Sequence, residues 1–232
     1  MLGVAVNFGL VILGSLLGLL LKKGVSEGLN KAIMSAIGLC VMFVGIDGML
    51  GYTEPIVIII SMVIGAAIGT LLKLEERLNS LGDEISNKFV KANGNGHFTE
   101  GFVTATLLFC IGAMAITGSV SAGLNGDNSI LFTKSVIDFV SAIMLTVSLG
   151  IGVALAAVPV LLYEGALVLL ASLLQSTLSA GATDALVCVG SIIILAIGIN
   201  LTGMAKFKIA NFLPAIILAP FAFYLIELIT RG

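Results

Sequence analysis

The sequence is poor in charge. Only 10% of its 232 residues are charged and the net charge is −2, whereas about a quarter of the residues in a soluble domain are charged. Apolar residues make up 59% of the chain, and the mean hydropathy is +1.19. They fall into runs of about 20 residues, the length at which a helix crosses a hydrocarbon core of roughly 30 Å. The sequence therefore predicts an all-α, polytopic protein embedded in a lipid bilayer.

Histidine, cysteine and tryptophan are scarce, with one, three and no residues respectively. Cys40, Cys110 and Cys188 lie in apolar runs without CxxC spacing, which predicts neither a disulfide framework nor a metal site. His97 lies in a Gly/Asn-rich stretch, and we expect it to be solvated. The sequence has no phosphate-binding glycine loop, HExxH or GxSxG motif. We therefore expect no enzyme, no cofactor and no metal, and the near-neutral charge indicates no nucleic-acid partner.

The apolar runs predict eight spans. The first is expected to be retained, because Lys22 and Lys23 follow it and no basic residue precedes it, the reverse of a cleavable signal. The segment 132–172 is too long for one crossing, and Gly150 and Gly152 supply a turn; the alternative is one span with a trailing interfacial segment. The predicted spans are 3–21, 32–51, 55–73, 101–123, 132–149, 151–172, 184–203 and 209–229.

The basic residues favour one orientation. Eight spans with the N-terminus outside place nine of the eleven lysines and arginines inside, leaving only Lys134 and Arg231 outside. Seven spans would move Lys206 and Lys208 outside, a poorer fit to the positive-inside rule. The sequence thus predicts a multi-pass protein of the cell inner membrane with both termini outside.

The only long polar segment, 74–100, separates the first three spans (1–73) from the five that follow (101–232) within a single membrane domain. Its first part, 74–92, places apolar residues on one helical face, which is typical of a helix on the membrane surface or against a partner. The remainder is expected to be a flexible loop. The apolar face consists of Leu74, Leu78, Leu81, Ile85 and Phe89.

Three predicted spans share an ending of two small residues and a lysine, each four residues apart. Small residues at this spacing let helix backbones approach closely, and the lysine can extend to the headgroups. We expect the glycines to serve helix packing; a duplicated unit, inverted from span four onward, is the alternative. The motifs are Gly14–Gly18–Lys22, Gly65–Gly69–Lys73 and Gly198–Thr202–Lys206.

Ionisable residues inside spans are costly, which makes them functional candidates. Glu164 lies deep in span six and is interpreted either as a cation or proton site on a wet pathway, or as a carboxyl bonded to a neighbouring helix. Lys134 and Asp138 are four residues apart in span five and can pair. We favour a structural ion pair for them; the alternative is the polar mouth of a pathway.

Span four carries a stripe of small and hydroxyl residues, and the helix-breaking run GSVSAGLNGDNS follows it. Irregular backbone at membrane depth is tolerated where it lines a cavity, so residues 104–128 are the first candidate for a substrate path. Asn7, Asn200 and Asn211 are expected to bond between helices. The candidate path comprises Thr106, Cys110, Thr117, Ser121, Lys134, Asp138, Ser141, Glu164 and Asn200.

Several runs carry a resemblance to a known family: NFGLVILGSLLGLLLKKG (7–24), EGFVTATLLFCIGAMAITGS (100–119), GDNS (126–129), KSVID (134–138), GIGVALAAVPVLLYEG (150–165) and GINLTG (198–203). The chain resembles the bacterial membrane proteins known as domain of unknown function 554. The resemblance implies a multi-pass inner-membrane protein, often labelled a transporter without an assigned substrate. Lys134 and Asp138 match the family pattern, whereas the position of Glu164 is often glutamine there.

These features lead to two functional hypotheses. The first is a small transporter or channel for a monovalent ion or small polar solute, working as a homodimer because eight short-looped helices make a small pathway. The second is a non-transporting membrane scaffold or regulator whose surface helix binds a partner. Flux through reconstituted protein, and charge reversals in 74–92, would distinguish them.

Overall fold

The computed structural model describes residues 1–22, 26–89, 97–111, 113–171 and 179–231. Over these ranges the chain is helical and contains no strand. This confirms the predicted all-α membrane bundle, with a separate helix at 74–89. The elements in chain order are α1 (Leu2–Lys22), α2 (Glu27–Met49), α3 (Pro55–Leu71), α4 (Leu74–Phe89), α5 (His97–Cys110), α6 (Ala113–Asn125), α7 (Ser129–Leu149), α8 (Gly152–Leu155), α9 (Ala157–Leu169), α11 (Ala180–Thr202), η1 (Ile209–Phe212) and α12 (Leu213–Arg231).

Local sequence signals set several helix ends. Ser26 and Ser179 precede α2 and α11, and each hydroxyl accepts a hydrogen bond from the backbone N–H three residues later. Pro55 opens α3, where its missing N–H costs nothing. Gly150 and Gly203 end α7 and α11 with φ of +84° and +77°, values that favour glycine. The turn predicted at Gly150 is confirmed.

α1 and α7 run side by side in the same direction. Gly3 lies against Leu131, and Gly18 lies against Ile143, so residue numbers rise together along both helices. A Cβ atom added at Gly14 would lie 2.5 Å from the backbone oxygen of Phe139. Only a missing side chain permits this approach, so the glycines of α1 set its distance from α7.

Two further helix pairs pack through glycines in opposite directions. In α2, Gly38 lies against Thr202 of α11, whereas Gly48 lies against Ser191. The glycines of α3 pack in the same manner on α12 and on η1, which precedes it, and backbone atoms approach closely. The contacts are Gly65 with Ala215 and Gly69 with Asn211.

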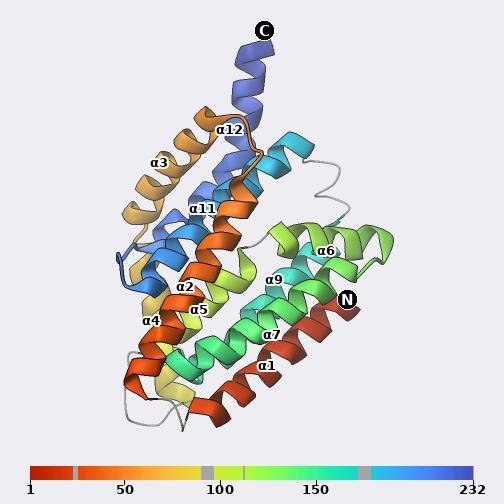
Figure 1. The fold of residues 1–232 in the computed structure, drawn as a ribbon. Coiled ribbons are helices and arrows are strands. Elements are labelled where there is room, and N and C mark those ends of the chain that lie inside the picture. The colour runs from red at the N-terminus through yellow and green to blue at the C-terminus, as the bar shows by residue number, and fades with distance from the viewer. Residues whose placement is uncertain (23–25, 90–96, 112, 172–178, 232) are drawn as a thin grey trace.

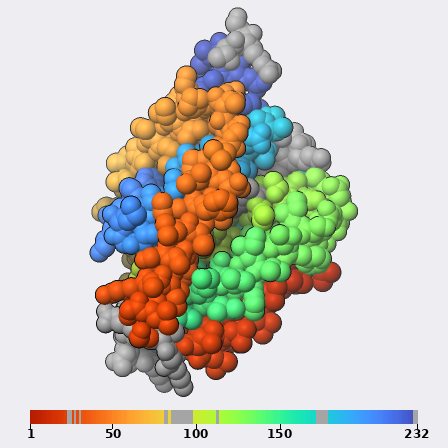
Figure 2. Space-filling view, in the orientation of Figure 1, coloured from red at the N-terminus to blue at the C-terminus, as the bar shows by residue number. Residues whose placement is uncertain are grey.

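The bundle has two groups of helices (Figure 1). One group contains α1, α6, α7, α8 and α9, and the other contains α2, α3, α11 and α12. α5 packs on α7, α8 and α9 of the first group and meets α4, which docks on η1 of the second. On the face shown in Figure 2, α2 lies between α3 and α7. α5 therefore lies at the junction of the two groups.

Apolar side chains cover the outside of the bundle. Leu20, Leu71 and Leu228 are each more than 70% exposed, as expected for side chains that contact lipid. Within the described ranges, six helices are long and apolar enough to cross a membrane, and two bent helix pairs raise the number to as many as eight. The eight predicted spans correspond to the upper number.

The helix directions gather the basic residues at one end of the bundle. Lys22 reaches Gly150 at the end of α7, and Lys208 bonds to Glu76 of α4. Lys73 and Lys206 follow the ends of α3 and α11 at this same end, which we call the lysine end. Which compartment the lysine end faces remains a prediction.

Span four departs from its prediction. Instead of one helix over 101–123, α5 starts earlier, at His97, and ends at Cys110; α6 follows with a bend of 55° between Phe98–Cys110 and Met114–Asn125. The run 118–125, predicted to break the helix, is helical because its serines and glycines pack between neighbouring helices, as Gly123 does against Val168. The polar stripe is therefore split. The flexible loop expected from residue 91 to the end of the polar segment is wrong for its last part, because residues 97–100 form the first turn of α5. The rest of that loop lies outside the described residues, as do Lys23 and residue 172.

Candidate functional site

Three helices bring ionisable and amide side chains together inside the bundle. α7 supplies Lys134 and Asp138 one turn apart, α9 supplies Glu164, and α1 supplies Asn7. The Lys134 ammonium contacts the Asp138 carboxylate and lies 3.0 Å from Oε1 of Glu164. The four residues, here called the buried cluster, are at most 6% exposed. The structural ion pair predicted in span five thus extends to Glu164.

Asn7 ties the two carboxyl groups together. Its Nδ2 donates to Oδ2 of Asp138 at 3.0 Å and to Oε1 of Glu164 at 2.9 Å. Oδ1 of Asn7 and Oε2 of Glu164 are buried and have no hydrogen-bond partner among the described residues. Val4 and Val11, about one turn on either side of Asn7 in α1, and Val160, one turn before Glu164 in α9, are also buried. The cluster is therefore enclosed by protein, and one carboxyl oxygen in it has no donor within the described part of the chain.

Two residues of the predicted path line a second feature, an apolar cavity of about 330 Å³. Thr106 and Cys110 of α5 contribute polar atoms, and Tyr163, the neighbour of Glu164, faces the same space. The Thr106 hydroxyl is buried without a partner in the described part of the chain. The cavity thus lies beside the buried cluster, between α5 and α9 on one side and α11 and α12 on the other.

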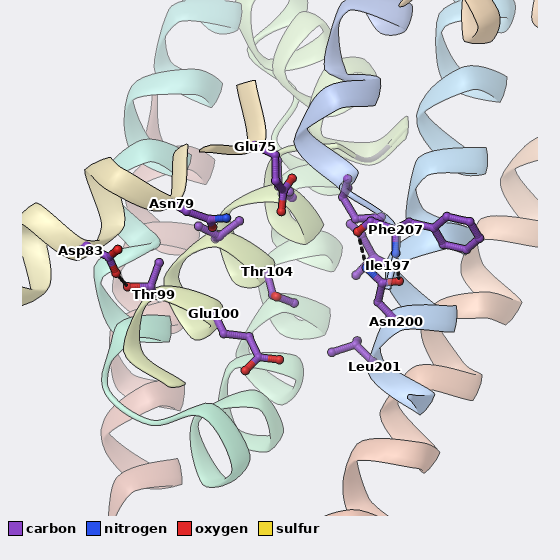
Figure 3. Close-up of a pocket in the computed structure, with 13 residues that line it drawn as sticks. Glu75, Asn79, Asp83, Thr99, Glu100, Thr104, Ile197, Asn200, Leu201 and Phe207 are labelled. Atoms are coloured by element: carbon purple, nitrogen blue, oxygen red, sulfur yellow. Dashed lines mark hydrogen bonds between the residues drawn. The ribbon is translucent and has the colours of Figure 1, made fainter. Parts of the chain in front are cut away.

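A third feature is a polar cavity of about 370 Å³ at the lysine end (Figure 3). Residues of α4, α5 and α11 line it, and α4 and α5 supply three carboxyl groups; within the part of the chain that the structure describes, none of the lining residues is basic. We call it the acidic cavity. Its polar lining consists of Glu75, Asn79, Asp83, Thr99, Glu100, Thr104 and Asn200.

Hydrogen bonds hold the walls of the acidic cavity. The Thr99 hydroxyl donates to Asp83 at 2.6 Å and joins α5 to α4. Asn200 bonds to both backbone groups of Phe207 at 2.8 Å and fixes the turn after α11. Asn200 therefore belongs to this cavity and lies apart from the buried cluster with which it was grouped in the predicted path.

Leu107 lines both cavities. It lies in the last turn of α5, with Thr104 on the acidic side and Cys110 on the apolar side. The two cavities share this residue as a wall, and both lie along the junction between the two helix groups. Along α5, the residues that line the cavities run from the acidic cavity at the lysine end to the apolar cavity, which Tyr163 also lines.

The remaining candidates of the predicted path lie elsewhere. Thr117 is exposed on α6, and Ser121 and Ser141 are half-buried; none of the three is among the residues that line the two cavities. The bend before α6 explains this separation, because it turns Thr117 and Ser121 away from the line of Thr106 and Cys110.

Sequence reasoning did not identify the partners of two asparagines. Asn7 was expected only to bond between helices, and no signal in the sequence identified its two carboxyl partners on α7 and α9. Asn211 bonds between helices as expected, and its partner is at a helix start: its Oδ1 accepts from the N–H of Glu75 at the start of α4. In return, Glu75 accepts from the N–H of Ala210. This exchange docks α4 on η1.

The fold and the buried cluster define a multi-pass helical membrane protein with ionisable groups in its interior. The chain belongs to the DUF554 family, described as proteins of unknown function, whose model matches residues 2–224. It is 34% identical to the uncharacterized membrane protein YdfK of Bacillus subtilis (strain 168), covering 98% of this chain and 97% of that one. It is 30% identical to the uncharacterized protein YqgA of Escherichia coli (strain K12), covering 94% of each chain. No solved structure matches the chain.

Proposed function

We propose that the chain is a membrane transporter or channel for an ion or small polar solute. The buried cluster carries this proposal. Each charged side chain near a bilayer centre costs about 2.5–3.5 kcal/mol on insertion scales, and such residues typically mark ion or solute pathways. Packing alone does not need Lys134, Asp138 and Glu164, because apolar residues of similar volume usually stabilise a buried site as well or better.

The arrangement of helices supports a route. Cavities at the junction of two helix groups suit a protein in which one group moves against the other. The interrupted helix α5–α6 resembles the discontinuous helices that line transport sites. The proposed route runs from the acidic cavity past Leu107 into the apolar cavity, and then by Cys110 and Tyr163 to the buried cluster.

The charge of the acidic cavity favours cations over anions as the solute. Glu75, Asp83 and Glu100 line it, and no basic residue is among the described residues of its lining. A cavity of one sign attracts ions of the opposite sign. A monovalent cation is therefore the first solute to test.

Flux through purified protein in liposomes tests the proposal. The panel consists of Na⁺, K⁺, small anions and small neutral polar solutes, each compared with protein-free vesicles. We expect protein-dependent flux of a cation in wild type and its loss in Asp138→Asn, because the variant removes the carboxylate that pairs with Lys134.

Asp127→Asn is the matched control, since Asp127 is an exposed carboxyl in the loop before α7. Circular dichroism and gel filtration show whether the variants fold. If wild type moves no member of the panel, or if a folded Asp138→Asn moves the solute at the wild-type rate, the proposal fails.

A scaffold or regulator is the second candidate. α4 presents Glu76, Arg77 and Ser80 on the outside of the bundle, a charged face on which a partner could dock. Charge reversals Glu76→Lys and Arg77→Glu would abolish its cellular activity under this proposal, whereas Asp138→Asn would not. We further propose that the protein catalyses no reaction. We also propose that the functional unit is a homodimer, and the mass of the purified protein in detergent would test this oligomeric state.

A further inference from the structure

The charges of the buried cluster do not balance. Lys134 carries one positive charge, and Asp138 and Glu164 would carry two negative charges if both were ionised. The residual negative charge would lie in a region closed to water, since Glu164 is fully buried. An uncompensated buried charge costs several kcal/mol, and the usual remedy is that the group becomes neutral.

The hydrogen bonds identify the group that becomes neutral. Oδ2 of Asp138 receives both the Lys134 ammonium and the Asn7 amide. Glu164 receives the same two donors on Oε1. Each carboxyl group therefore has one oxygen that neither donor reaches, but among the described residues it is Oε2 of Glu164, and not Oδ1 of Asp138, that is fully buried without a partner. A carboxylate oxygen without a donor is costly to bury, whereas the neutral acid needs no second donor.

We propose that Glu164 is a proton-binding site, and that the buried cluster holds one proton on Oε2 of Glu164 while Lys134 and Asp138 remain an ion pair. The proton comes from a hydronium ion at the membrane surface: one O–H bond of the hydronium breaks and leaves water, and one O–H bond forms on Oε2, which converts the carboxylate into a carboxylic acid. This step changes the net charge of the cluster from −1 to zero. No other bond forms or breaks.

A proton fits this site better than a metal cation. Lys134 already occupies the position between the two carboxyl groups where a cation would bind, and a proton needs no additional space. The helices packed on α9 offer few other charges: α6 and α8 contain no titratable residue. The titratable and polar groups that face Glu164 are Lys134 and Asp138 of α7, Asn7 of α1, Cys110 of α5, and its neighbour Tyr163.

Infrared spectroscopy of the purified protein in lipid tests the site without any transport measurement. A protonated carboxyl group gives a carbonyl stretching band distinct from those of carboxylates. We expect this band in wild type at neutral pH and in the control Asp127→Asn. We expect its loss in Glu164→Gln, whose amide retains an oxygen in the place of Oε1.

Two further variants test the charge balance itself. Asp138→Asn leaves one lysine with one carboxylate, so Glu164 should ionise and the band should disappear although Glu164 is present. Lys134→Met leaves two carboxyl groups without a cation, so the band should about double. A wild type without the band, a band that persists in Glu164→Gln, or a folded Asp138→Asn that keeps the band would each overturn the proposal.

The use of this proton in transport rests on the proposed function. Where flux is found, we expect it to depend on pH in wild type and to lose that dependence in Glu164→Gln. A missing infrared band with intact flux refutes the proton site alone. A band that follows the variants as expected, together with no flux for any solute, refutes the transport proposal alone.

Discussion

The buried cluster and the acidic cavity both collect carboxyl groups, but different partners stabilise them. In the cluster, Asp138 and Glu164 are closed off from water and depend on one ammonium and one amide. In the cavity, Glu100 is exposed, and Asp83, also exposed, accepts from the hydroxyl of Thr99. Removing an ion-pair or hydrogen-bond partner should therefore lower the free energy of unfolding strongly in the cluster and weakly in the cavity. The predictions below run from the largest expected change in stability to the smallest.

Lys134→Met should have the largest effect. It removes the cation that contacts both Asp138 and Glu164, and breaking a buried ion pair costs about 3–5 kcal/mol. Thermal unfolding in detergent measures the loss. The double variant Lys134→Met/Asp138→Leu should recover much of it, because one neutral carboxyl then remains with no unpaired charge. Equal stability of Lys134→Met and wild type would show that water reaches the cluster more readily than its burial indicates.

Leu107→Ala should have the next largest effect. Leu107 is 6% exposed and borders both cavities. A buried Leu→Ala change costs about 2–5 kcal/mol, and open space on two sides places this one near the lower limit. Leu108→Ala, on the same helix but absent from both cavity walls, is the control. If Leu107→Ala lowers the stability but does not change how readily solutes pass between the two cavities, Leu107 serves packing alone.

Asn200→Ala should lower the free energy of unfolding less than either of the two changes above. The side chain makes two hydrogen bonds to the backbone of Phe207, and each contributes about 1 kcal/mol. The unfolding midpoint and the proteolysis rate of the turn 203–208 report the change. Asn200→Asp keeps the acceptor for the Phe207 N–H and should lie between wild type and Ala. An unchanged midpoint in Asn200→Ala would mean that the turn is held by other contacts.

The smallest effect is expected at the exposed pair of Lys208 and Glu76. The hydrogen bond from Lys208 to the Glu76 carboxylate raises the pKa of the Lys208 ammonium. A raised lysine pKa contributes stability at neutral pH that is lost only as pH rises through the folded-state pKa. Glu76→Gln should lower the pKa of Lys208, as measured by NMR titration, without a measurable change in stability, since exposed pairs contribute little. A clear loss of stability would show that α4 depends on this pair.

Composition and periodicity were sufficient for the membrane class, most helix ranges and the turn at Gly150. These features depend on neighbours in sequence and on the thickness of the bilayer. The Lys134–Asp138 pair was also predictable, because residues four apart on a helix lie on one face. Glu164 was identified as a functional candidate because placing an ionisable side chain inside the bilayer costs free energy.

The sequence could not show which helices bring those groups together. The contact between Asn7 and Glu164 joins residues 157 positions apart, and it depends on how closely α1 approaches α7. The break after Cys110 was missed for a similar reason. Glycine and serine can either interrupt a helix or allow close packing, and at 118–125 tertiary contacts decide for the helix. The acidic cavity was missed because α4, α5 and α11 supply its carboxyl and amide groups from distant segments.

The most direct test of a single route through both cavities uses the native thiol of Cys110. In a background in which Cys40 and Cys188 are replaced by alanine, a water-soluble maleimide is added to protein in liposomes. If the route passes Leu107, Cys110 should react, and Leu107→Ala should accelerate the reaction. If Cys110 reacts only with a lipid-soluble maleimide, and Leu107→Ala leaves both rates unchanged, the two cavities are not parts of one route.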